Sequence, residues 1–384
     1  MSPLTRTLRL LIGALLGALA TPLAAEAPPV NAPDSTPPPS LKISGFAVAS
    51  YVYSNKTIDP NLIVGRLFDR YSSAFIINAA KLTLDRPFVA TKLDAGAHVD
   101  LIFGQDAEVL HSSGSSSPFS LGPNGDIEQA YAIVNIPTKS GTGVQLKVGK
   151  MVTLMGLEVI ETVANPNFSE GNLFNLVENF TSTGAELDFK PSSAVDVELR
   201  VDDGWDRVVV PDGQKSFTGR IGIAAGKTSL GLLGYWGNQE ANNNDAPRYG
   251  AEALLNQKFG KASFWVQGDW GTEKANAALP DPTVDAKWWA VSGWLAGDVS
   301  PNANLAVRAD YLDDTNGFRT SGVLGFPVST GEAQKLWSLT GTINIKAFAG
   351  ALVRPEVRYD HSNLVVFDDQ TSQVSFALSV AYSF

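Results

Sequence analysis

The chain has 384 residues, a formal net charge of −10 and no cysteine. Without cysteine there is no disulfide, thiol chemistry or cysteine-ligated zinc site, and an acidic chain with no basic stripe is a poor partner for nucleic acid. After the first 25 residues no uncharged apolar run reaches 18 residues, which excludes membrane-spanning helices. The 35 glycines and the 8 Trp, 9 Tyr and 19 Phe residues suit strands and turns.

The N-terminus has the order of a secretory signal peptide: two arginines, an apolar run over 10–20, then small residues. We predict a signal peptide over residues 1–25 that is removed on export. A short membrane anchor is the alternative, but the apolar run is short and prolines follow it. Residues 26–40 are rich in proline and predict an extended periplasmic linker, and residues 41–384 form the predicted folded domain.

From residue 41 onward apolar and polar residues alternate, which is the period of a strand with one apolar face. Residues 373–384 show this most clearly, because every second residue there is apolar and those between are small or polar. The pattern predicts strands at 42–54, 73–85, 91–104, 127–136, 144–155, 180–189, 195–201, 216–225, 228–236, 248–256, 262–270, 287–296, 304–312, 335–345, 349–360 and 372–384.

The connections between these strands alternate between short and long, as in outer-membrane barrels with short periplasmic turns and long external loops. Strands of about ten residues also fit a tilted crossing of a bilayer. We therefore predict an all-β fold, a transmembrane antiparallel β-barrel of about 16 strands in the bacterial outer membrane. A soluble all-β domain is the alternative, because its wet outer face also produces alternation.

Charged residues on the predicted strands must face water, since Arg or Lys facing lipid would cost roughly 2–4 kcal/mol at the bilayer midplane. A barrel of about sixteen strands is wide enough to enclose an aqueous channel. The residues expected to line this channel are Arg200, Arg220, Arg308, Arg354, Arg358, Asp188, Asp196, Glu198, Asp310, Glu356 and Asp360. They either brace the wall through ion pairs or set the field that selects solutes.

The long segment 156–179 is too apolar for a loop in water, so we expect it to fold back into the lumen and form the narrowest point. Its large apolar residues are Leu157, Val159, Ile160, Phe168, Leu173, Phe174 and Leu176. The glutamates of this constriction loop, which would face Arg200, Arg220, Arg354 and Arg358, are Glu158, Glu161, Glu170 and Glu178. The alternative places the segment on the outer rim, at a subunit interface, with its glutamates in water.

Several stretches resemble one known family. Residues 148–189, where a Gly-Lys strand end leads through Asn-Phe-Ser to a Thr-Gly strand, resemble the middle of the OmpL-like β-barrel porin-2 family. RADYLDD (308–314) and LVRPEVRYDHS (352–362) are similar to that family's late strands, and VAYSF (380–384) to the terminal signature of outer-membrane proteins. The resemblance covers nearly all of the predicted mature chain and implies a passive channel.

The sequence offers little for catalysis or metal binding. His98 lies on a predicted lumen face and His111 and His361 at loop positions, and no serine has the G-x-S-x-G context of a hydrolase. The DDTNG segment at 313–317 offers clustered oxygens but lacks the spacing of an EF-hand loop, so a solvated turn is favoured. We expect no enzymatic activity, cofactor or metal.

These features predict a porin: a water-filled channel for passive diffusion of small polar solutes and ions, with a modest preference for cations because the chain is acidic. Its expected partners are outer-membrane lipids, the barrel-assembly machinery, small polar solutes and, in a homo-oligomer, further copies of itself, but not nucleic acid. The alternative function is a plugged structural or adhesive barrel whose external loops bind a surface partner. Stepwise conductance in a planar bilayer separates the two.

Overall fold

The computed structural model describes residues 39–111, 118–138, 143–209, 213–239, 246–276, 278–323, 325–328 and 330–384. The predicted signal peptide and most of the predicted linker lie outside the described residues. The described part of the chain contains three short helical turns: α2 (Gln105–Val109), η1 (Thr162–Ala164) and α3 (Asn172–Leu176). Within this part of the chain no helix has the length and apolar character needed to cross a bilayer.

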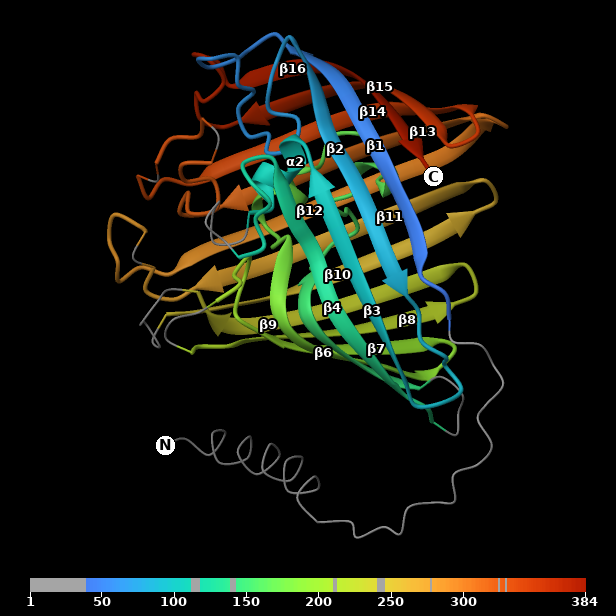
Figure 1. Cartoon of the computed structure of the whole chain (residues 1–384). Coiled ribbons are helices and arrows are strands. Elements are labelled where there is room, and N and C mark those ends of the chain that lie inside the picture. Colours follow the sequence, from blue (N-terminus) through green and yellow to red (C-terminus); the bar gives the residue numbers. More distant parts are fainter. Residues whose placement is uncertain are drawn as a thin grey trace, which may run out of the picture. The chain divides into compact units, whose positions relative to one another are not determined.

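The strands of the described residues close into one antiparallel barrel, in which each strand pairs with its neighbours in sequence and β1 pairs with β16 (Figure 1). The strands are β1 (Lys42–Ser54), β2 (Ala74–Arg86), β3 (Asp94–Phe103), β4 (Gly125–Ile136), β5 (Val144–Val152), β6 (Thr181–Ser192), β7 (Val195–Asp202), β8 (Ser216–Ala225), β9 (Thr228–Asn238), β10 (Pro247–Phe259), β11 (Ala262–Glu273), β12 (Ala286–Ser300), β13 (Ala303–Asp314), β14 (Gln334–Phe348), β15 (Ala351–Ser362) and β16 (Ser372–Ser383). The predicted barrel of sixteen antiparallel strands is confirmed.

Several predicted boundaries were wrong by a few residues. Strand β12 continues to Ser300 rather than 296, and β10 continues to Phe259 rather than 256. Strand β5 ends at Val152 instead of 155, and β3 begins at Asp94 instead of 91. Ladder hydrogen bonds to the neighbouring strand decide where a strand ends, whereas alternation records only which face is apolar.

The apolar faces of the strands point outward. Along β16, Phe376, Leu378 and Val380 are exposed on the outside, while Ser375 and Ser379 on the opposite face are buried. A soluble β-sandwich places its apolar face inside instead. An apolar outer surface with a polar inner face is the arrangement of a barrel in a bilayer, and it excludes the soluble alternative.

The long loops lie at one end of the barrel and the short turns at the other (Figure 1), and two of the long loops supply much of the hydrophobic core. The loop over 153–180 supplies much of it, together with the loop over 55–73, and both pack against inward-facing strand residues. Buried members from these two loops include Ile63, Phe68, Phe168, Leu173 and Phe174. The lumen is therefore partly filled by folded loop rather than lined by strands alone.

Candidate functional site

The segment between β5 and β6, residues 153–180, is folded into the barrel and is here called the inner loop. Its apolar residues Ile160, Phe168, Leu173, Phe174 and Leu176 are each at most 3% exposed. They can be buried because they pack on one another and on the loop over 55–73, where Phe68 contacts the rings of Phe174 and Phe180. Helix α3 lies against β12, β13 and β14.

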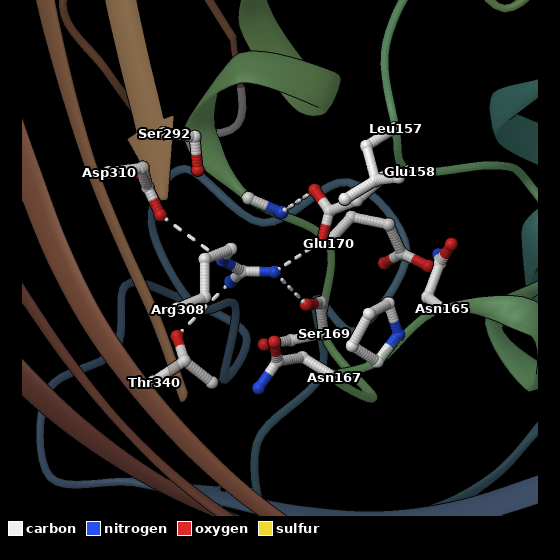
Figure 2. A network of polar contacts seen from close by, with 12 residues as sticks. Leu157, Glu158, Asn165, Asn167, Ser169, Glu170, Ser292, Arg308, Asp310 and Thr340 are labelled. Atoms are coloured by element: carbon white, nitrogen blue, oxygen red, sulfur yellow. Dashed lines mark hydrogen bonds and ion pairs between the residues drawn. The ribbon is translucent and has the colours of Figure 1, made fainter. Parts of the chain in front are cut away.

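Arg308 of β13 joins the inner loop to the wall (Figure 2). Alternation along β13 turns this arginine and Asp310 inward, and the Arg308 side chain is fully buried. Its Nη1 donates to Glu158 Oε1 at 2.5 Å and to the Ser169 carbonyl at 2.6 Å. Its Nε donates to Asp310 at 3.2 Å, and its Nη2 donates to Thr340 at 3.1 Å. Each nitrogen of the buried guanidinium therefore has an acceptor.

Two arginines of β15 bind the inner loop through backbone oxygens. Arg354 donates to the carbonyls of Thr162 at 2.6 Å and Asn165 at 3.0 Å. Arg358 donates to the carbonyl of Glu170 at 2.6 Å and holds Asp360 on its own strand at 2.7 Å. These bonds satisfy loop carbonyls that have no sheet partner, which is why an irregular segment can be buried here.

Between these arginines, Glu356 of β15 accepts from the loop backbone. The N–H groups of Phe168 and Ser169 donate to its carboxylate at 2.7 and 3.1 Å. The arginines of the wall thus donate to carbonyl groups of the loop, and the glutamate between them accepts from N–H groups of the loop. Arg308, Arg354, Arg358, Asp310, Glu356 and Asp360 all face inward as the sequence predicts, but they are covered by the inner loop.

The predicted pairing between the loop glutamates and four arginines was wrong. Glu158 binds Arg308, and Glu161 binds Lys81 of β2. Glu178 accepts from Gln267 of β11 at 2.6 Å, and in the described residues the Glu170 side chain forms no ion pair. Partners of a returning loop depend on where each of its residues meets the wall, which alternation does not specify.

Burial dominates the ionisation of these loop glutamates. It raises the pKa of Glu158, although the Arg308 charge opposes the rise. It raises the pKa of Glu170 well above its ordinary value, and the nearby carboxylates Asp106 and Asp69 add to that shift. The pKa of Glu178 is also raised well above its ordinary value by burial and by Glu252. The inner loop therefore carries less negative charge than its composition suggests.

The wall formed by β5–β8 lies on the other side of the lumen. Arg200 binds Glu186 at 2.5 Å, and Arg220 binds Asp196 at 2.9 Å and Glu198 at 2.8 Å. Asp188 lies 3.8 Å from Lys147. Among these charged residues, the side chains of Asp196 and Arg220 are 35% and 30% exposed, so both reach the open lumen.

Two cavities lie between this wall and the inner loop. One, of about 220 Å³, is lined by Lys147, Glu186, Glu198 and Arg200 together with Val152 and Leu154. The other, of about 240 Å³, is lined by Arg220 and Glu198 on one side and by Val159, Ile160 and Phe174 of the loop on the other. The open part of the lumen therefore lies between charged side chains of the strands and apolar side chains of the inner loop.

Sequence reasoning missed several polar residues that hold the inner loop. Three of them are lone charged residues in strand segments whose other residues are mostly apolar or small, namely Lys81, Glu252 and Asp269. This position could have identified them as residues that face the lumen. Arg66 binds Asp69 at 2.6 Å and Asp360 at 3.0 Å, but it comes from the irregular loop over 55–73. Periodicity carries no signal for such a residue.

The histidines are held by wall and loop contacts. His98 of β3 contacts Asp85 at 3.3 Å and Asp100 at 3.1 Å and stacks on Tyr131 of the neighbouring strand. His111, in the loop after α2, contacts the carbonyl of Gly125. The ring of His361, which lies on β15 and not in a loop, packs beside Trp337.

A closed sixteen-stranded barrel with an apolar outside, a charged lumen and a loop folded inward defines an outer-membrane channel. The sequence profile of the OmpL-like β-barrel porin-2 family matches residues 40–384, so the chain belongs to that family. The protein is an outer-membrane porin, a channel for solute diffusion.

Solved structures share the fold at low sequence identity. The outer membrane channel DcaP of Acinetobacter baumannii is 12% identical, with a TM-score of 0.61, covering 90% of this chain and 97% of that one. The trimer form of OmpT of Vibrio cholerae is 11% identical (TM-score 0.61; 90% and 99% covered). The anion-selective porin from Comamonas acidovorans is 10% identical (TM-score 0.60; 90% and 99% covered). No curated protein matches the sequence.

Proposed function

We propose that small polar solutes and ions cross the barrel along the β5–β8 wall, beside the inner loop, which acts as the constriction. One observation carries this proposal. The inner loop is bound to β13–β15 and buries their charges, whereas Asp196 and Arg220 on the opposite wall keep about a third of their exposure. A solute that avoids apolar surface therefore finds exposed polar partners on that wall.

The charges of the wall beside this passage balance. Strands β5–β8 carry the carboxylates Glu186, Asp188, Asp196, Glu198 and Asp202 and the basic groups Lys147, Lys150, Lys190, Arg200 and Arg220. The two signs are equal in number, and neighbouring pairs neutralise most of the field. Weak selectivity for small ions and general passage of small polar solutes are the expected result.

Removing part of the inner loop tests the constriction. We expect deletion of residues 160–175 to raise single-channel conductance roughly twofold or more, because the segment occupies lumen volume. The same deletion uncovers Arg308, Arg354 and Arg358 and removes Glu161, so the ion selectivity should shift toward anions. Planar-bilayer recordings in a salt gradient measure both quantities.

The deletion is informative only in a folded barrel, which heat-modifiable migration in SDS checks independently. An unchanged conductance in a folded, inserted variant would show that the loop is not the constriction. Absence of stepwise conductance from the intact protein would instead favour the plugged structural or adhesive barrel. The two outcomes can be told apart, because the first is measured on the deletion variant and the second on the intact protein.

Assembly into a homo-oligomer is part of the proposal, supported by the trimer form of the similar OmpT structure. The exposed apolar belt, which includes Phe75, Leu378 and Val380, offers surface for both lipid and a second copy. Insertion of such a belt requires the barrel-assembly machinery as a transient partner. Chemical cross-linking in native membranes, resolved by SDS electrophoresis, checks whether copies associate.

A further inference from the structure

Three buried carboxylates meet where the inner loop approaches β10 and β11. They are Glu178 of the loop, Glu252 of β10 and Asp269 of β11, and each offers an oxygen within 4.8 Å of the other two. Their side chains belong to residues that are 4%, 6% and 6% exposed. Three ionised carboxylates at this spacing would repel one another strongly in a dry site.

A second cluster in the same barrel shows how such repulsion is relieved. Asp100, Glu128 and Glu161 also come within 4.8 Å of one another, where the other end of the inner loop meets the wall. The Lys81 ammonium lies among them, 2.8 Å from Asp100 and 3.1 Å from Glu128, and it also contacts Glu161. Here the protein supplies the positive charge itself.

In the described part of the chain, no lysine or arginine forms an ion pair with Glu178, Glu252 or Asp269. The charge of Arg220 acts on Glu252 from a distance, but its Nη1 is hydrogen-bonded to Asp196 and Glu198. The groups that do bind the cluster are uncharged. Gln267 Nε2 donates to Glu178 at 2.6 Å and to Asp269 at 3.1 Å and lies 3.4 Å from Glu252, and the Gly156 N–H donates to Glu252 at 2.7 Å.

Oxygen atoms of the cluster remain without partners. Glu178 Oε2 and Asp269 Oδ1 are buried and accept no hydrogen bond from any described residue. Space beside Glu178 is kept clear by Gly156, whose φ is +80° and whose Cβ, if present, would lie 2.2 Å from Glu178 Oε2. Buried carboxylate oxygens without donors are costly unless a further positive group binds them.

We propose that Glu178, Glu252 and Asp269 bind a divalent cation of the calcium class, which clamps the inner loop to β10 and β11. All available donors are hard oxygens, the ligands that Ca²⁺ prefers, and Ca²⁺ tolerates irregular geometry and accepts water in its remaining positions. The cation neutralises the carboxylates around Glu178, as the Lys81 ammonium neutralises those around Glu161. The proposal does not depend on which solutes cross, since binding and melting need no conductance.

Calcium titration of the purified, detergent-solubilised protein tests the site. The wild type, treated with EDTA, should bind one Ca²⁺ per chain by isothermal titration, and its melting temperature should rise on adding Ca²⁺. In Glu252→Gln/Asp269→Asn both responses should be lost, or weakened at least about tenfold, because two anionic ligands are gone. Asp281→Asn, on an exposed loop carboxylate, is the matched control and should behave as wild type.

A lysine in the cluster gives a second, independent variant. Gln267→Lys places an ammonium where the amide now contacts all three carboxylates, imitating Lys81. It should melt in EDTA at or above the temperature of wild type in EDTA, with no response to Ca²⁺. Absence of Ca²⁺ binding by wild type, or unchanged binding in Glu252→Gln/Asp269→Asn, would overturn the proposal. So would stabilisation by acid alone, between pH 7.5 and about 5.5, without Ca²⁺ binding, since protons would then neutralise the cluster.

Discussion

At the scale of single residues, the inner loop is held by a few buried charges that hydrogen-bond to it. Arg308 is the clearest, because Glu158, Ser169, Asp310 and Thr340 together accept from each of its nitrogens. Breaking a buried ion pair on one side leaves an uncompensated charge, whereas removing both partners can be nearly neutral. That asymmetry makes the role of Arg308 measurable.

We expect Arg308→Met to weaken docking of the inner loop by roughly 3–5 kcal/mol, because Glu158 and Asp310 lose their buried counter-charge. The barrel should remain closed, since its ladders do not involve this side chain. Limited proteolysis should cut within 153–180, and open-channel noise should increase. Adding Glu158→Gln in the same chain should recover part of the protection. If the single variant is as resistant as wild type, Arg308 does not hold the loop.

Glu170 predicts a pH dependence of stability. Burial raises its pKa well above the ordinary 4.5, so the folded protein keeps a proton that the unfolded chain releases. Stability from this group is therefore fully present below the unfolded pKa and declines as pH rises toward the raised folded pKa. The charged groups facing it are Asp69, Asp106, Glu158 and, from β15, Arg354.

Glu170→Gln should accordingly raise the melting temperature at pH 7.5 by a few degrees and leave it unchanged near pH 4.5. The amide has the shape of the protonated acid and cannot ionise. Glu332→Gln, on an exposed loop glutamate, is the matched control and should change nothing at either pH. Melting followed by circular dichroism at both pH values measures the difference, and a lower melting temperature of Glu170→Gln at pH 7.5 would contradict this reasoning.

At the scale of elements, closure of the barrel depends on the seam between β1 and β16. Phe384, just beyond β16, exchanges two backbone hydrogen bonds with Gly45 of β1, at 3.1 and 3.0 Å. Its ring packs on Gly45, where a Cβ would lie 2.8 Å from the ring. The last residue thus extends the ladder that closes the barrel.

Deleting Phe384 should lower the amount of folded protein in the outer membrane more than truncating any long loop. The deletion removes two ladder bonds and an aromatic contact at the seam, whereas truncating a long loop between its two ends leaves the ladder of the seam in place. Phe384→Tyr keeps both features and should reach normal levels. Heat-modifiability of membrane fractions reports folding, and normal levels of the deletion variant would refute the prediction.

At the scale of the whole molecule, ion selectivity depends on the charges that line the open passage and not on the overall acidic composition. Much of the lumen charge is covered by the inner loop, so the net charge of −10 is a poor guide to selectivity. We expect weak ion selectivity governed by the β5–β8 wall. Arg220→Gln should increase the preference for cations by about twofold, because Arg220 is partly exposed in the passage.

Reversal potentials in a salt gradient measure this preference. Lys287→Gln, on an exposed residue at the start of β12, should leave the reversal potential unchanged. An anion preference in the wild type would show that basic groups dominate the passage. No change in Arg220→Gln would place the ion path away from the β5–β8 wall.

The sequence by itself determined the barrel. Alternation over sixteen segments defines which side chains face lipid and which face the lumen, and the alternation of short and long connections sets the order of pairing. Both are local properties, because a strand has a period of two wherever it lies. For the same reason the inward direction of Arg200, Arg308 and Arg358 followed from their neighbours alone, and the apolar residues of 156–179 indicated burial.

Only the tertiary structure decided which partners these residues meet. Glu161 binds Lys81 and Glu178 approaches Glu252, contacts between segments 80 and 74 positions apart in the chain. Such pairings depend on the stagger of the strands and on where an irregular loop touches the wall, and neither has a period in the sequence. Arg66 shows the limit most plainly: it reaches Asp360 across 294 positions from a loop without regular structure, because the closed barrel brings both into the same interior.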